Sequence, residues 1–281
     1  MRLFSRKPVV PVLRFSGPIG VVTPLRPGLS MATASLAINQ AFKASKTPAV
    51  AIIINSPGGS PVQSSLIFQR IRQLSNETGK TVYVFCEDVA ASGGYYLAAA
   101  GDEIHANTSS IVGSIGVISA GFGFTEAIKK LGIDRRVYTS GDTKNQLDPF
   151  LPENAEDIKR LRAVQRDVHD AFIGIIKERR GAKLSGPDSE LFSGAFWSAP
   201  KAMELGLIDG ISDVRTKMRA VFGDKVHLKL ISSRRGGLAG LFRRQPSVRD
   251  CAQGGMTNPP DFADGLISAI ETRMLWSRFG L

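Results

Sequence analysis

The chain has few of the residues that cross-link a small domain or bind a metal. Among its 281 residues are two cysteines, Cys86 and Cys251, and three histidines. Two cysteines argue against a disulfide framework. The absence of a CxxC pair or a His/Cys cluster gives no sign of a metal site. With 43% hydrophobic residues, the chain can bury one sizeable core. We therefore expect a fold held by apolar burial, with no cofactor and no metal.

The sequence also lacks a convincing membrane span or secretory signal. Its basic N-terminal stretch is interrupted by Pro8, Pro11 and Arg14, which leaves the apolar run too short to cross a bilayer. The net charge of +11 includes basic pairs at residues 234–235 and 243–244, but no aromatic residues alternate with them. We expect a cytoplasmic protein that does not bind nucleic acid, and leave open a peripheral contact with the inner membrane.

Composition divides the chain into three parts. Residues 1–231 are expected to form the main domain, and residues 232–260 a flexible, basic linker rich in glycine and proline. Residues 261–281 place apolar side chains at helical spacing and predict an amphipathic C-terminal helix. Such a helix can dock on its own domain, on a neighbouring subunit or on a membrane surface.

Within the main domain, the pattern indicates a mixed α/β fold. Short runs rich in apolar and β-branched residues predict strands near residues 9–15, 49–55, 81–86, 111–119 and 135–139, with helices between them. The longest predicted helix covers residues 152–180. It begins with acidic residues and ends with basic residues before a glycine, as the helix dipole favours.

Two glycine-rich turns follow two of these strands. Residues 49–54 form a continuous apolar run that leads into Asn-Ser-Pro-Gly-Gly-Ser at 55–60. Residues 81–86 form a second run, and Ser92 then stands before Gly93 and Gly94. Parallel strands would bring both turns to the carboxyl edge of one sheet. There Ser92 is either a nucleophile exposed at a tight turn or a helix N-cap with glycines for packing.

Four segments carry a family resemblance. They are NSPGGS from residue 55, ASGGYYLAAAGDEIHA from residue 91, IVGSIGVIS from residue 111 and LFSGAFWSAPKAMELGLIDGI from residue 191. In this order and spacing they resemble the signal peptide peptidase A family of serine peptidases. The resemblance runs from about residue 9 to residue 231. It implies a Clp-protease/crotonase-like spiral of β-β-α units and a ring-shaped homo-oligomer. It also implies an endopeptidase for hydrophobic peptides such as remnant signal peptides.

The same resemblance assigns roles to individual residues. Ser92 is expected to be the nucleophile and Lys144 the general base. The expected oxyanion donors are the backbone N–H groups of Gly93 and of Gly58 or Gly59, and Ser114 is a candidate to orient Lys144. A lysine acts as a base only when its amine is neutral, which requires the ordinary lysine pKa of about 10.4 to fall by roughly three units.

Other interpretations stay open at this point. A serine nucleophile can also be activated by a histidine, and the candidates are His105, His169 and His227, although each reads as an ordinary surface or strand residue. The same fold could perform acyl-CoA chemistry, with the glycine turns holding a thioester oxyanion. The chain could also be a non-catalytic scaffold that uses its basic linker and C-terminal helix.

Overall fold

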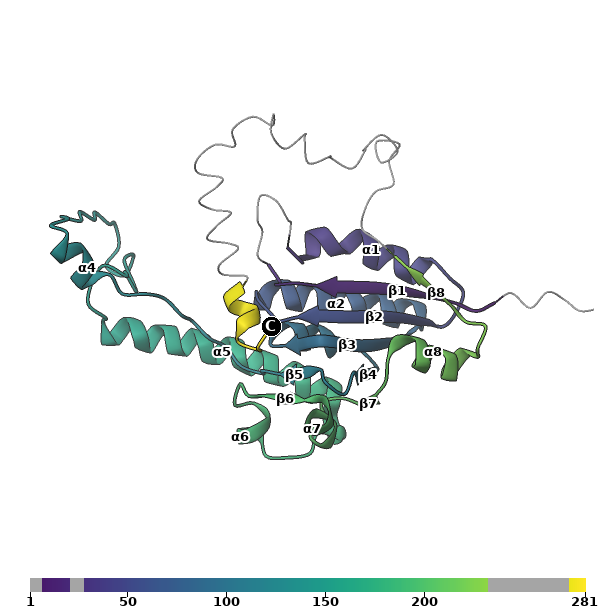
Figure 1. Cartoon of the computed structure of the whole chain (residues 1–281). Helices are drawn as coiled ribbons and strands as arrows, with labels where there is room; N and C mark the ends of the chain where they lie inside the picture. The colour runs from purple at the N-terminus through teal and green to yellow at the C-terminus, as the bar shows by residue number, and fades with distance from the viewer. Residues whose placement is uncertain (1–6, 21–27, 232–272) are drawn as a thin grey trace, which may run out of the picture.

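A computed structural model describes residues 7–20, 28–231 and 273–281 of the chain (Figure 1). The strands are β1 (Val9–Ser16), β2 (Ala49–Ser56), β3 (Thr81–Ala91), β4 (Glu103–Ala106), β5 (Ile111–Gly113), β6 (Phe196–Ser198), β7 (Gly210–Ile211) and β8 (His227–Leu230). The helices are α1 (Met31–Lys43), α2 (Pro61–Thr78), α3 (Gly93–Ala98), α4 (Thr125–Lys130), α5 (Ala155–Arg180), α6 (Asp188–Leu191), α7 (Ala199–Glu204) and α8 (Val214–Phe222), with a 3-10 turn η1 (Gly181–Lys183).

The strands of the described residues form one largely parallel sheet, so the predicted mixed α/β class is confirmed. The strand order is β6-β5-β3-β2-β1-β8, and β4 pairs with both β3 and β7. Among these pairings, only β5 with β6 is antiparallel. The three long strands β1, β2 and β3 lie side by side and are covered on both faces, which explains their nearly continuous apolar sequences.

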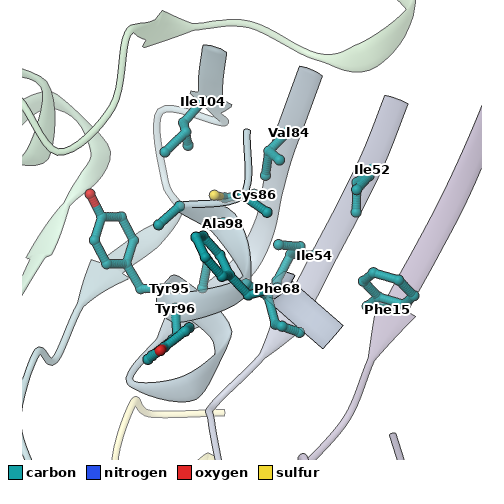
Figure 2. Packing of buried hydrophobic residues seen from close by; sticks show 14 of the residues in the cluster. Phe15, Ile52, Ile54, Phe68, Val84, Cys86, Tyr95, Tyr96, Ala98 and Ile104 are labelled. Carbon is teal, nitrogen blue, oxygen red and sulfur yellow. The ribbon is translucent and has the colours of Figure 1, made fainter. Parts of the chain in front are cut away.

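Alternate residues of these strands supply two separate cores. On one face, Phe15, Ile52 and Ile54 pack with residues of α1, α2 and α3. On the other face, Val10 and Ala51 pack with residues of α8. Figure 2 shows part of the first core, where strand side chains meet α3 and Phe68 of α2. The period of two along each strand therefore places one set of side chains against α1, α2 and α3 and the other set against α8.

Strand β3 divides its free edge between two partners. Its first half, Tyr83 to Cys86, pairs with β4, and its last three residues, Val89 to Ala91, pair with β5. Its other edge pairs with β2 along most of its length. The residue that follows β3 therefore emerges between the end of β2 and the end of β5.

Helix α5 extends beyond the sheet. Its N-terminal part and the segment between β5 and α5, which contains α4, form a projection from the domain. In Figure 1 the helix runs away from the body of the domain, and α4 lies at the far end of this projection. The helix predicted at residues 152–180 is confirmed at 155–180. Two strand predictions need correction. Residues 135–139 lie in the projection without a strand partner, and the predicted strand 111–119 ends at Gly113. Gly113 and Ser114 both have positive φ angles, which end the extended conformation.

The end of the chain packs on the sheet. Residues 232–272, which include the predicted linker, Cys251 and most of the predicted C-terminal helix, lie outside the described residues. Residues 273–277 are helical, and Phe279 packs with Val89, Ala91 and Ile111. Its ring also meets that of Phe196, with centroids 5.1 Å apart. In the parts of the chain that the structure describes, no helix has both the length and the apolar character that crossing a bilayer demands.

A buried ion pair fastens the C-terminal end of α5 to the sheet. The guanidinium of Arg180 lies 2.8 Å from the carboxylate of Asp209, and its Nε donates to the carbonyl of Gly206. Asp209 also accepts hydrogen bonds from Lys183 and from the N–H of Ile104 in β4. Burial by itself raises the pKa of Asp209, but these hydrogen bonds outweigh it and lower the pKa from 3.8 to about 2.

This pKa predicts how stability depends on pH. Because the folded protein holds Asp209 with a lowered pKa, its ionised form stabilises the fold above pH 3.8, and the contribution is lost as the pH falls towards 2. The contribution is about 2 kcal/mol, since each pKa unit corresponds to about 1.4 kcal/mol. Asp209→Asn should therefore lower the free energy of unfolding at pH 7 by about 3–5 kcal/mol, because it leaves Arg180 buried without its partner. Urea unfolding followed by circular dichroism measures both effects.

Asp224→Asn provides a matched control. Asp224 pairs with Arg219 at 3.3 Å, but its side chain is 88% exposed. Exposed pairs contribute about 0–1 kcal/mol, so this variant should unfold almost as the wild type does. An equal loss of stability in both variants would show that the ion pair of Asp209 with Arg180 stabilises the fold no more than an exposed pair does.

Candidate active site

Ser92 occupies the sharp turn between β3 and α3. Its φ of 53° and ψ of −123° lie in a region that residues with side chains seldom adopt. Its backbone N–H donates to the carbonyl of Gly113 at 2.8 Å, which holds the turn against the end of β5. Although Ser92 stands at the N-cap position of α3, its hydroxyl makes no capping hydrogen bond. The structure therefore does not support the N-cap interpretation, because the hydroxyl does not bind the N–H groups of α3.

The second glycine turn packs directly against the first. A Cβ atom at position 58 would lie 2.8 Å from Ser92 Cβ and 2.9 Å from the amide nitrogen of Gly93. A Cβ atom at position 59 would lie only 2.1 Å from the carbonyl oxygen of Ile19. Both glycines also have positive φ angles, 104° and 140°. The predicted meeting of the two turns at the carboxyl edge is thus confirmed, and glycine is required there for space as well as for conformation.

Within the part of the chain that the structure describes, the two turns differ in which of their N–H groups make hydrogen bonds. The N–H of Gly58 donates to Ser56 Oγ at 3.2 Å. The amide nitrogen of Gly59 lies 3.4 Å from where a Cβ of Gly93 would stand. Gly93 is the first residue of α3, so its N–H has no acceptor within the helix. The amide nitrogen of Gly59 therefore lies near Gly93, the residue after Ser92, whereas the N–H of Gly58 donates to Ser56.

Ser114 is also close to this turn. It follows Gly113, whose carbonyl accepts the N–H of Ser92, and it is 8% exposed with a φ of 53°. Its own N–H donates to the carbonyl of Ala195 at 2.6 Å. Ser114 is thus the residue directly after Gly113, which accepts the hydrogen bond from Ser92.

A small apolar space opens beside Ser92. Its volume is about 30 Å³. Glycines 59, 93 and 116 lie around it together with Ser92, and its walls come from Pro61, Tyr96, Val117, Val168 and Phe172. Val168 and Phe172 are one turn apart on α5, so they share a face of that helix. The sequence shows that spacing, but nothing in it indicates that this face meets Ser92, so these wall residues were not predicted.

Lys144 lies elsewhere in this single chain. It is exposed in the segment between α4 and α5, and it is not among the residues that line the space beside Ser92. The neighbouring Leu147 donates its N–H to Asp157 in the first turn of α5. Because an α-helix rises 1.5 Å per residue, Ala155 at the start of α5 is roughly 25 Å along the axis from Phe172. The structure therefore does not bring Lys144 to Ser92 within one chain.

The three histidines occupy different places. His227 is exposed on β8. His105 is buried, stacks on Phe85 with ring centroids 5.6 Å apart, and pairs with Glu103 at 3.0 Å. His169 lies on α5 with Nε2 3.0 Å from the carbonyl oxygen of Ile115, the residue after Ser114. Of the three, only His169 is adjacent in the chain to a residue that lines the space beside Ser92, namely Val168.

Comparison with known proteins bears on this arrangement. Residues 75–225, more than half of the chain, match Peptidase family S49. A protein from Brucella abortus named "Na(+)/H(+) antiporter NhaA" is 52% identical over 97% of this chain. The chain spans only 37% of that protein's length, and the same share of its Brucella melitensis counterpart. The antiporter name therefore refers to a much longer protein.

Other relatives have names that denote proteases. "Putative protease slr0021" from Synechocystis is 31% identical over 84% of this chain and 82% of its own length. "Serine protease SPPA, chloroplastic" from Arabidopsis thaliana is 30% identical over 77% of this chain and 31% of its own length. These matches favour the peptidase prediction over the acyl-CoA and scaffold alternatives. The chain belongs to peptidase family S49, the signal peptide peptidase A family of serine peptidases.

Proposed function

We propose that this chain is an endopeptidase in which Ser92 is the nucleophile and Lys144 the general base. The observation that carries the proposal is the turn at Ser92, where a hydroxyl without a capping bond lies beside the N–H groups of Gly59 and Gly93. Two N–H donors next to a serine suit the oxyanion of an acyl-transfer reaction. Of the two candidates in the Gly58–Gly59 pair, Gly59 is the better supported, because Gly58 donates to Ser56.

The reaction follows from these groups. The neutral amine of Lys144 takes the proton of Ser92 Oγ as the oxygen bonds to the carbonyl carbon of the substrate. The oxyanion that forms accepts hydrogen bonds from Gly59 and Gly93. The C–N bond then breaks, Lys144 returns the proton to the leaving amine, and an acyl-enzyme remains. The same lysine then takes a proton from a water molecule that attacks the ester carbonyl carbon. The bond from that carbon to Ser92 Oγ breaks, the lysine returns the proton to Oγ, and the second product leaves with a new carboxyl group. Ser114, close to this turn, is proposed to orient the lysine.

We propose that the lysine reaches Ser92 from a neighbouring copy of the chain in a ring-shaped oligomer. The segment that carries Lys144 projects from the body of the domain (Figure 1). The projection exposes large apolar side chains, including Phe122 at 71%, Leu131 at 73% and Tyr138 at 90%. A concentration of exposed apolar residues is typical of a surface that another protein covers. Burial of this surface between copies would also remove water from the amine.

The proposed substrates are hydrophobic peptides such as remnant signal peptides. The space beside Ser92 has apolar walls, and no charged side chain is among the described residues that line it. The name "Putative signal peptide peptidase SppA" belongs to an Enterococcus faecium relative that is 30% identical over 58% of this chain. We propose the same activity for this chain. We also propose that the chain has the Clp-protease/crotonase-like spiral of β-β-α units.

Mixed variants test the shared site. Ser92→Ala and Lys144→Ala should each abolish hydrolysis of a quenched hydrophobic peptide, because each removes one half of the dyad. Coexpression of the two variants with different tags, followed by purification on both tags, should restore activity. About a quarter of the wild-type rate is expected if subunits mix at random in a head-to-tail ring, since one site in four then pairs an intact serine with an intact lysine.

Two further variants make this result interpretable. Lys130→Ala removes an exposed lysine of α4 on the same projection and should leave the rate unchanged. His169→Gln tests the histidine nearest the site. Loss of activity in both single variants without recovery in the mixture would place the dyad within one chain. Activity that survives Lys144→Ala but not His169→Gln would move the role of base to His169.

The close contact of the two turns gives a second prediction. Gly58→Ala should lower kcat/KM by a factor of about 100 or more, because the new methyl group would push Ser92 and Gly93 away from the oxyanion position. Gly17→Ala is the matched control, since Gly17 has a similar φ of 93° but nothing within 4 Å of the added Cβ. Both variants should lose about 1–2 kcal/mol of stability from backbone strain. Gly58→Ala should lose about 1–3 kcal/mol more, because its methyl group overlaps Ser92 and Gly93. Equal rates for the two variants would contradict the proposed packing.

A further inference from the structure

The space beside Ser92 is small enough to restrict which peptide bond can be cut. Its volume is about 30 Å³. A cavity of roughly 150 Å³ lined by apolar side chains holds a benzene molecule, whereas about 10–15 Å³ is enough for one water. The space next to Ser92 therefore has room for a methyl or ethyl group and not for a phenyl ring.

The walls of this space are held by the core. Tyr96 is 8% exposed and lies between two other aromatic rings, with centroids 5.5 Å from Phe68 and 4.9 Å from Phe172. Phe172 is itself 5% exposed. Figure 2 shows Tyr96 and Phe68 within the packed cluster around α3. A larger substrate side chain would have to displace several rings together, which close-packed interiors resist.

Helix α5 is fixed where it presents Phe172 to α3. Two turns beyond Phe172, Arg179 donates hydrogen bonds to the carbonyls of Ala99 and Gly101 and pairs with Asp102 at 3.0 Å. These acceptors lie just after α3, so the same two helices that form the wall are bound to each other. The position of Phe172 relative to Ser92 is thus set by polar contacts as well as by packing.

We propose that the residue whose carbonyl Ser92 attacks carries a small uncharged side chain, of the size of alanine, and that Phe172 and Val168 of α5 set this limit. The inference rests on the proposed function, because it concerns the substrate of the same site. A side chain on that residue must occupy the space next to the nucleophile when the carbonyl reaches the N–H groups of Gly59 and Gly93. Leucine and phenylalanine exceed the available volume.

A peptide series tests the limit. Quenched hydrophobic peptides that differ only at the residue before the cut, with glycine, alanine, valine, leucine or phenylalanine, would be compared by kcat/KM, with the cleaved bond identified by mass spectrometry. The wild-type protein should prefer alanine over phenylalanine by at least about tenfold, since one extra methylene in a filled pocket already costs about 10–200-fold. Phe172→Ala should reverse or remove this preference.

Val168→Ala serves as a second variant if Phe172→Ala does not fold. Val168 is only half-buried, so its truncation should leave the fold intact while it enlarges the same space. It should raise the rate for valine and leucine relative to alanine. Val164→Ala is the matched control, because Val164 lies one turn earlier on α5 and is 59% exposed. It should leave the preference unchanged.

Labelling of Ser92 by a fluorophosphonate, a reagent that reports a reactive serine, separates the two proposals. The inference is supported if Ser92 is labelled, the wild type cuts after alanine, and Phe172→Ala or Val168→Ala shifts this preference towards larger residues. Labelling with equal or faster cleavage after leucine or phenylalanine in the wild type overturns the size limit alone. An unchanged preference in both Phe172→Ala and Val168→Ala also overturns it. Absence of both labelling and hydrolysis overturns the proposed function and the inference together.

Discussion

The geometry around Ser92 depends on the close contact between its turn and the turn that holds Gly58 and Gly59. Gly58 approaches Ser92 so closely that even a methyl group would overlap with it. The backbone of Ser92 is also in a conformation that costs of order 1–3 kcal/mol. The surroundings maintain it, because its N–H is bound to Gly113 and the following helix α3 is buried along its whole length. The buried core thus holds one serine in a strained and accessible position.

Helix α5 connects this rigid region to the projecting one. Its C-terminal end is fastened by Arg179 to the end of α3 and by Arg180 to Asp209. Its middle supplies Phe172 to the space beside Ser92. Its N-terminal end supports the segment that contains Lys144. One helix therefore sets a wall of the site in its own chain and, under the proposed function, the position of the base that it offers to a neighbour.

The sequence predicted the parts of this arrangement that depend on local patterns. The apolar runs at 49–54 and 81–86, followed by glycine turns, indicated two parallel strands that end at one edge, and the structure confirms them as β2 and β3. Residues 135–139 have strand composition but no partner strand, so that prediction was wrong. The contacts of Phe172 and His169 with the surroundings of Ser92 could not be predicted, because they join residues between 54 and about 80 positions apart. Such contacts depend on how α5 crosses the domain, which no local pattern specifies.

Under the proposed function, the division of the site between the core and the projection has a consequence for activity. Ser92 and the neighbouring N–H groups are held by close packing, so they are in place in every folded copy. The segment with Lys144 has few buried side chains and exposes several large apolar ones, as surfaces that another protein covers often do. If a second copy provides that surface, association buries the projection and completes the dyad in the same step. Assembly would then depend on concentration and would control hydrolysis by mass action, so an isolated chain would carry a prepared nucleophile without its base.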